Sequence, residues 1–198
     1  GEFYETRYFC PCNRPAVPFS LGGKEIWFGT DILLEAQGME GLRVECEICE
    51  DIWAPDEPGI SHALAGATVL VNLSASNETI GKDAYREMLV KSSSARLIAG
   101  YVYCSGGEGE STQDVVYGGH DIIAENGRIL AQSKKFESQI VYGDLDISRL
   151  CMERRRMNTF TCGEKPGYRR ISFMLKEEET KLTRSFPCLP FVPSDQKE

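Results

Sequence analysis

Histidine is nearly absent from this sequence, whose 198 residues include only two, His62 and His120. A Ser-His-Asp or Cys-His catalytic arrangement, or a histidine-rich metal site, would have to use one of these two residues. Any catalysis is therefore expected to depend on a thiol, a carboxylate or an amine.

Long hydrophobic runs and an excess of positive charge are also missing. No apolar run approaches the roughly 20 residues that a membrane span needs, and residues 1–5 do not resemble a signal peptide. The 30 acidic and 22 basic residues give a formal net charge of −8, which would repel a phosphate backbone. We therefore expect a cytoplasmic protein that binds neither membrane nor nucleic acid. The one dense basic run, 154–156, is expected to be the solvated end of a helix.

Cysteine is moderately abundant, with eight residues in the chain. This number is too low for a disulfide-stapled scaffold, in which cysteine exceeds roughly 8–10%, so most of the thiols are predicted to be reduced and buried. Cys10, Cys12, Cys46 and Cys49 could together bind zinc. However, Cys46 and Cys49 would point to opposite faces of a strand, so we predict no metal site and keep zinc as an alternative.

The first half of the chain alternates between strand and helix patterns. Residues 42–48 alternate with period two, a short helix is expected at 59–66, and 67–73 form an apolar strand, which together predict a βαβ unit. A helix capped by Asp83 is expected to run to about residue 99. Its inward face is predicted to consist of Ala84, Met88, Leu89, Ser92 and Ala95. A strand at 98–104 follows.

The second half contains a loop at 106–111 and an Asn126-Gly127 pair between apolar runs, which predicts a β-hairpin. Further expected elements are strands at 139–144 and 171–175 and a helix at 147–157. Leu150 and Cys151 are expected to face inward, and Met157 is a further candidate for the inward face. Residues 1–160 are assigned to one domain, and residues 161–198 to a junction segment.

Cys49 lies where the strand pattern gives way to a turn. A thiol at such a position can project into a cleft while the following N–H groups face a developing oxyanion, as in a nucleophile elbow. A buried structural cysteine is the alternative.

The segment 47–53, with the sequence EICEDIW, resembles the nucleophile motif of the nitrilase-type glutaminase (amidase) domains of glutamine-dependent NAD synthetases. Other stretches agree in the same order along the chain. They are residues 2–7, 72–77 with 80–82, 94–96 with 101–103, 107–112 and, at the expected junction with a synthetase domain, 190–195.

The resemblance implies a role for individual residues. Cys49 would be the nucleophile that attacks the side-chain amide of glutamine, and the N–H of Glu50 would face the oxyanion. Glu5 would be a supporting acidic residue. Ser76 and Lys82 would hold the α-carboxylate of glutamine, for which a hydroxyl and a cation are suitable partners.

The implied fold is an α-β-β-α sandwich of the α/β class, with this chain as its C-terminal part. The family's general-base Glu and carbonyl-polarising Lys precede the motif at residues 3–5, so neither is in this sequence. We therefore expect poor glutamine binding and slow turnover by these residues alone. An incomplete sandwich would also leave an apolar sheet face uncovered.

The resemblance also implies partners. The glutaminase part needs no cofactor, whereas ATP, Mg²⁺ and deamido-NAD would belong to a separate synthetase domain. L-Glutamine, that domain and further copies of the chain in a homo-oligomer are the expected partners. Two alternatives remain open: a free-standing nitrilase-type amidase acting on another small amide, and a thiol-rich or zinc-binding interaction module.

Overall fold

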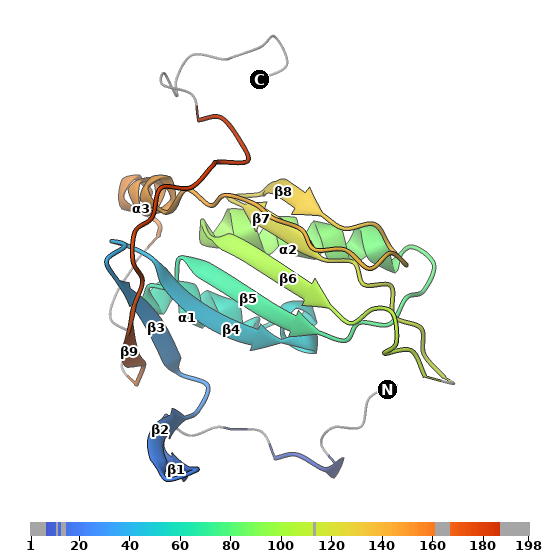
Figure 1. Ribbon diagram of the computed structural model, residues 1–198, viewed down its shortest axis with the longest axis horizontal. Helices are drawn as coiled ribbons and strands as arrows, with labels where there is room; N and C mark the ends of the chain where they lie inside the picture. Colours follow the sequence, from blue (N-terminus) through green and yellow to red (C-terminus); the bar gives the residue numbers. More distant parts are fainter. Residues whose placement is uncertain (1–6, 11, 13–14, 113, 161–166, 187–198) are drawn as a thin grey trace.

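A seven-stranded mixed sheet forms the body of the protein in the computed structural model (Figure 1), which describes residues 7–10, 12, 15–112, 114–160 and 167–186. The strand order is β8-β7-β6-β5-β4-β3-β9. The strands are β3 (Ile32–Gln37), β4 (Arg43–Ile48), β5 (Val69–Ser74), β6 (Gly100–Ser105), β7 (Ile122–Glu125), β8 (Arg128–Gln132) and β9 (Arg169–Met174). A separate antiparallel hairpin consists of β1 (Val17–Leu21) and β2 (Lys24–Phe28).

The centre of the sheet is parallel, and its edges are partly antiparallel. Strands β4, β5 and β6 are parallel neighbours, whereas β7 and β8 continue the sheet as an antiparallel hairpin. That hairpin turns at Asn126 and Gly127, both with positive φ, as the sequence predicts. Strand β9, from within the predicted junction segment, pairs in parallel with β3.

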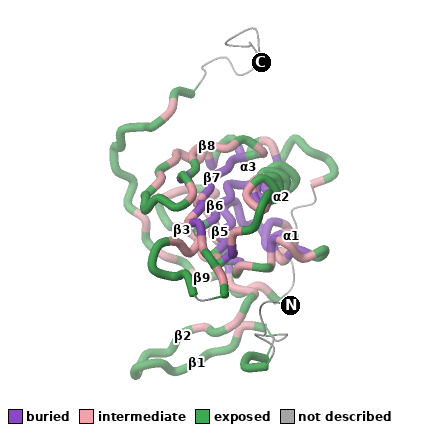
Figure 2. The backbone as a smooth tube through the Cα atoms, turned by 90° about the vertical axis from the view of Figure 1, so that its right-hand side faces the viewer, coloured by how far each residue is buried: buried purple, intermediate pink, exposed green. Residues whose placement is uncertain are grey.

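The helices are α1 (Pro58–Ala65), α2 (Lys82–Leu97) and α3 (Ile147–Arg156), together with the 3₁₀ helix η2 (Cys49–Trp53). Helix α1 connects β4 to β5, which confirms the predicted βαβ unit. Helices α1 and α2 lie on the same side of the sheet (Figure 2). In the described part of the chain, no helix combines the length and the apolar composition needed to cross a bilayer.

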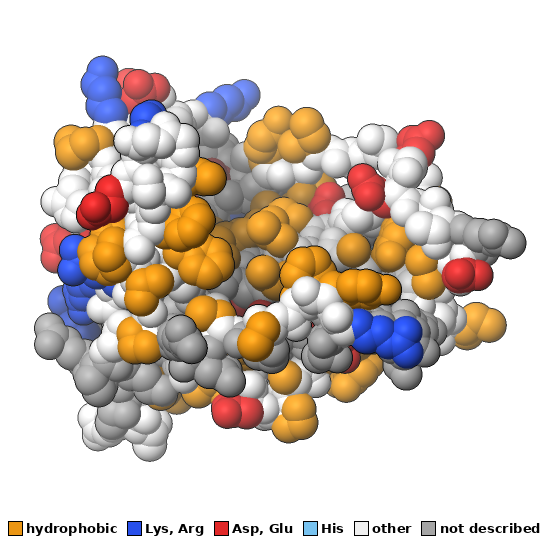
Figure 3. All heavy atoms as spheres, turned by 90° about the horizontal axis from the view of Figure 1, so that it is seen from below, with side chains coloured by type: hydrophobic (Ala, Val, Ile, Leu, Met, Phe, Trp, Pro, Cys, Tyr) orange, Lys and Arg blue, Asp and Glu red, His pale blue; other side chains and the backbone are white. Residues whose placement is uncertain are grey.

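The two faces of the sheet differ in burial. The main core lies on the face covered by α1 and α2, where Leu70, Tyr101 and Tyr103 are fully buried. On the opposite face α3 covers only one end, through Ile147 and Leu150. The rest of that face exposes a set of four side chains, called the open face below. They are Cys46, Ile48, Leu73 and Cys104. Hydrophobic side chains also gather around a hollow in the view of Figure 3.

Helix α2 differs from its prediction at its start and on its inward face. Its N-cap is Gly81, with φ of 81°, and Asp83 instead binds Lys135 in an ion pair. Ala84, Met88, Ser92 and Ala95 are exposed, and Leu89 is half-buried. The helix instead buries the residues on another face, namely Arg86, Val90, Ser93, Ser94 and Leu97. Polar contacts of Arg86 and Ser93 outweigh the weak apolar pattern that the sequence offers.

Three further predictions in the second half are wrong. Residues 139–144 form no strand, and Met157 is exposed. In the basic run, Arg154 is buried rather than solvated: its Nε donates to Ile98 O (3.0 Å) and its Nη2 to Leu97 O (2.9 Å). The end of a helix leaves carbonyls without helical partners, and Arg154 satisfies two of them at the end of α2.

The described cysteines are less buried than predicted. All six are free thiols, and Cys10, Cys12, Cys46 and Cys104 are exposed. Cys46 and Cys104 are accessible because they lie on the open face. Cysteine side chains are usually buried, but these two are exposed because no further layer covers this face of the sheet.

Candidate functional site

Cys49 is the turning point between β4 and η2, which confirms the strand-to-turn position expected from the sequence. Its φ of 49° lies in the left-handed region, which is strained for a residue with a side chain. Two side chains hold the turn: Asp51 Oδ2 accepts from Ile48 N (2.8 Å), and Asn72 Nδ2 donates to Cys49 O (3.3 Å). The backbone geometry of Cys49 is thus maintained by contacts on both sides.

A buried polar cluster lies beneath this turn. Glu47 is fully buried and accepts hydrogen bonds from Gly59 N (2.5 Å) and Tyr101 Oη (2.6 Å). Asn72 Nδ2 also reaches Tyr101 Oη, at 3.4 Å. A Cβ atom at Gly59 would lie 2.7 Å from Glu47 Oε1, so this close approach favours glycine. Burial raises the pKa of Glu47 to about 7.

A second set of hydroxyl groups reaches the sulfur of Cys49. Ser74 Oγ, at the end of β5, donates to Cys49 Sγ at 3.5 Å and lies 2.6 Å from Tyr103 Oη. Tyr103 is fully buried, and its pKa is raised mainly by desolvation. The sequence analysis did not select Ser74 or Tyr103, although the period-two alternation places Tyr101 and Tyr103 on the same face of β6.

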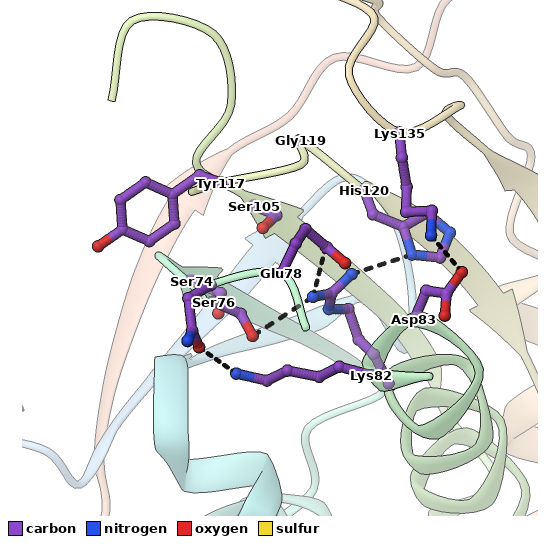
Figure 4. Close-up of polar contacts among 12 residues, drawn as sticks. Ser74, Ser76, Glu78, Lys82, Asp83, Ser105, Tyr117, Gly119, His120 and Lys135 are labelled. Atoms are coloured by element: carbon purple, nitrogen blue, oxygen red, sulfur yellow. Dashed lines mark hydrogen bonds and ion pairs between the residues drawn. The ribbon is translucent and has the colours of Figure 1, made fainter. Parts of the chain in front are cut away.

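Ser76 and Lys82 lie beside this end of the sheet, in the loop after β5 and at the start of α2 (Figure 4). Ser76 is only 3% exposed and accepts from Arg86 Nη2 at 3.4 Å. Lys82 Nζ donates to Asn77 Oδ1 and lies 5.4 Å from the centre of the Trp53 ring. The parallel strands thus bring the predicted substrate-binding residues to the same end of the sheet as Cys49.

Arg86 is a fully buried cation that the sequence analysis missed. Its Nη2 forms an ion pair with Glu78 Oε1 (2.7 Å), and its Nη1 lies 3.1 Å from His120 Nδ1. Desolvation and the adjacent guanidinium lower the pKa of His120, which favours a neutral ring that accepts from Arg86. An arginine on the inward face of an amphipathic helix offers no distinct sequence signal, because most arginines are solvated.

The roles of the other two predicted site residues, Glu5 and Glu50, stay predictions. Glu5 lies outside the described residues. Glu50 is exposed directly after Cys49, and the oxyanion role of its N–H stays a prediction. Within the described ranges no three or more His, Cys, Asp or Glu side chains gather as possible metal ligands.

The chain is similar to known proteins over most of its length. The family model described as carbon-nitrogen hydrolase matches residues 1–152. A glutamine-dependent NAD(+) synthetase of Mycobacterium tuberculosis is 41% identical over 98% of this chain and 30% of its own length. That of Thermotoga maritima is 31% identical over 74% of this chain and 22% of its own length. The chain thus spans less than a third of these relatives.

Solved structures show the same fold. A glutamine-dependent NAD(+) synthetase from Cytophaga hutchinsonii superposes with a TM-score of 0.54 and 32% identity, over 67% of this chain and 20% of that one. A nitrilase-superfamily member from Saccharomyces cerevisiae, at 23% identity and a TM-score of 0.51, covers 59% of this chain and 42% of its own, and supports the fold alone. Together with the match over residues 1–152, the nitrilase-type fold shows that the chain belongs to the carbon-nitrogen hydrolase family.

Proposed function

We propose that this chain is the glutamine-hydrolysing part of a glutamine-dependent NAD synthetase. The observation that carries the proposal is Cys49, held in a strained turn at the end of β4 and accompanied at that end of the sheet by Ser76 and Lys82. Strained backbone at a nucleophile is typical of catalytic turns. The similarity to glutamine-dependent NAD(+) synthetases supports glutamine as the substrate.

In this proposal Cys49 Sγ forms a bond to the side-chain amide carbon of L-glutamine. The C–N bond breaks, and the nitrogen takes up a proton and leaves as ammonia. Water then cleaves the thioester, which releases glutamate and restores the thiol. The N–H of Glu50 faces the oxyanion, Glu5 supports the site, and Ser76 and Lys82 bind the α-carboxylate.

The ammonia is used elsewhere. A separate synthetase domain, with ATP and Mg²⁺, transfers it to deamido-NAD to form NAD. The glutaminase part itself takes no cofactor, and we propose that the protein assembles as a homo-oligomer.

Protection of Cys49 from alkylation tests the choice of substrate. At the high concentration that weak binding requires, L-glutamine is expected to slow the reaction of Cys49 with iodoacetamide, whereas butyramide, which lacks the α-carboxylate and α-amino groups, is not. Lys82→Met and Ser76→Ala are expected to weaken this protection by about tenfold each, since each removes a polar partner of the carboxylate. Equal protection by both amides would instead support an amidase acting on another small amide.

A further inference from the structure

A series of polar groups extends from α2 towards the sulfur of Cys49. Arg86 Nη2 donates to Ser76 Oγ at 3.4 Å. Desolvation raises the pKa of Tyr103, and the hydroxyls of Ser74 and Ser76 and the charge of Arg86 partly oppose this rise, which places Ser76 among the polar neighbours of Tyr103. Tyr103 Oη lies 2.6 Å from Ser74 Oγ, which donates to Cys49 Sγ at 3.5 Å. Figure 4 shows Ser74 and Ser76 side by side at the end of β5. We call Ser76, Tyr103 and Ser74 the hydroxyl chain.

The chemistry of Arg86 fixes the direction of the first of these hydrogen bonds. A guanidinium group only donates, and it does not release its proton in proteins. Ser76 therefore accepts from Arg86 and, in the absence of glutamine, can direct its own proton to Tyr103. Tyr103 can then donate to Ser74, and Ser74 to the sulfur. In this arrangement each hydrogen bond would point from the cation towards Cys49.

Arg86 is held firmly at the start of this series. It is fully buried, paired with Glu78 and in contact with His120, and its guanidinium carbon lies 6.0 Å from the centre of the Tyr103 ring. Among the described residues, no hydrogen-bond partner reaches Arg86 Nε. A buried charge that is incompletely satisfied costs stability, so its presence calls for an explanation beyond folding.

We propose that Arg86 and the hydroxyl chain stabilise the thiolate form of Cys49 and orient its sulfur. The proposal rests on the assignment of Cys49 as the nucleophile. Ser74 is the member that touches the reacting atom. Arg86, Ser76 and Tyr103 act through it, and are positioning residues for this purpose.

The charged groups near Cys49 explain why the thiolate would need stabilisation by Arg86 and the hydroxyl chain. Several ionisable groups surround the turn, from β4, η2, α2 and β6: Glu47, Glu50, Asp51, Lys82, Arg86, Tyr101 and Tyr103. The three carboxyl groups, where ionised, disfavour a negative sulfur. Lys82 is engaged by Asn77 and Trp53, whereas Arg86 reaches the sulfur through hydrogen bonds that favour the charged form.

Alkylation by iodoacetamide tests the proposal without glutamine. In this reaction the sulfur bonds to the reagent's CH₂ carbon and iodide leaves, and peptide mapping measures the rate at Cys49 alone. Tyr103→Phe keeps the buried ring but breaks the hydroxyl chain, and is expected to slow alkylation at pH 7 by about tenfold. Ser74→Ala is expected to slow it at least as much. At about pH 10, where thiols are ionised without assistance, the variants and the parent protein should react alike.

The controls separate an electrostatic role from a structural one. Ser105→Ala removes a buried hydroxyl from the position that pairs with Ser74 in β6, and is expected to leave the rate unchanged. Cys46, exposed on the open face, serves as the reference thiol in every variant. Arg86→Met is expected to slow alkylation about threefold, and Tyr103→Phe decides the question if Arg86→Met does not fold.

Two results would overturn the proposal. One is an unchanged rate in both Tyr103→Phe and Ser74→Ala at pH 7. The other is a deficit that persists at pH 10, which would indicate a displaced sulfur. Neither result bears on glutamine as the substrate, because protection by glutamine is measured separately.

Discussion

The two faces of the central sheet differ in which side chains they bury and which they expose. The face under α1 and α2 buries the carboxyl groups of Glu45 and Glu47, whereas the open face exposes Ile48 and Leu73, at 68% and 56%. Within β4, hydrophobicity alone would assign the two faces the other way round. The buried polar residues support the turn at Cys49, and the exposed apolar residues suit a surface that another layer covers, as in a two-sheet sandwich.

The largest expected effect comes from removing a leucine from each face of one strand. Leu70 and Leu73 both lie in β5, but Leu70 is fully buried and Leu73 is 56% exposed. Leu70→Ala should lower the free energy of unfolding by about 3 kcal/mol, because it leaves a cavity. Leu73→Ala should change it by less than about 0.5 kcal/mol. Urea denaturation measures both, and a comparable loss in both variants would show that the open face is covered in solution.

The second prediction concerns the pH dependence of stability. Burial raises the pKa of Glu45 to about 8, from an ordinary value of 4.5. The protonated carboxyl is thus favoured in the folded state. The stability that depends on this proton is fully present below about pH 4.5, where Glu45 is protonated in both the folded and the unfolded state. It is lost as the pH rises towards 8.

Glu45→Gln should remove part of this dependence and stabilise the protein above pH 8, by an amount on the order of 2 kcal/mol. Urea denaturation between pH 5 and 9, a range chosen around the ordinary carboxyl pKa and its raised value, would detect the change. The exposed Glu50→Gln variant is the control and should keep the parent's profile. If the free energy of unfolding varied with pH in the same way in the parent and in Glu45→Gln, burial of the Glu45 carboxyl would not destabilise the folded protein at high pH.

A third prediction tests the cluster beneath Cys49. Tyr101→Phe removes the hydroxyl that donates to Glu47 and should cost about 1–2 kcal/mol, since it leaves a buried oxygen unsatisfied. Tyr142 is 71% exposed, so Tyr142→Phe is a matched control that should be neutral. Equal free energies of unfolding for the two variants would mean that the hydrogen bond from Tyr101 to Glu47 does not stabilise the fold.

The smallest effect on stability is expected on the open face itself. Ile48→Lys should change the free energy of unfolding by less than about 0.5 kcal/mol, yet reduce any self-association of the chain in sedimentation experiments, since large exposed apolar patches favour association. Met88→Lys places the same charge on the exposed side of α2 and should have no such effect. Association that survives Ile48→Lys would exclude the open face as the contact.

Local patterns predicted the elements that depend on local chemistry. The alternation at 42–48, the Asn126-Gly127 turn and the helix beginning at Ile147 correspond to β4, the β7–β8 hairpin and α3. The side of β4 that is buried could not be predicted, because it depends on which layers cover the sheet. The partners of Arg154 and Arg86 are distant in sequence, so their burial gave no local signal.

Some residues of the candidate site could be predicted from the sequence, and others could not. Cys49 could be located because a strand pattern stops there, and Ser76 and Lys82 through the family resemblance. Ser74, Tyr103 and Asn72 were missed, since their importance comes from strand register rather than from motif. A parallel sheet brings the ends of neighbouring strands together, and only the structure shows which side chains meet there.

The most direct measurement of the account is the position of a covalent adduct formed by a chloroketone analogue of L-glutamine. The seven other cysteines provide internal competitors, and four of those that the structure describes are exposed. Peptide mapping should find the adduct at Cys49, suppressed by excess L-glutamine and absent in Cys49→Ser. An adduct at the exposed thiols with Cys49 unmodified, or one that glutamine does not suppress, would contradict the assignment of Cys49 as the nucleophile.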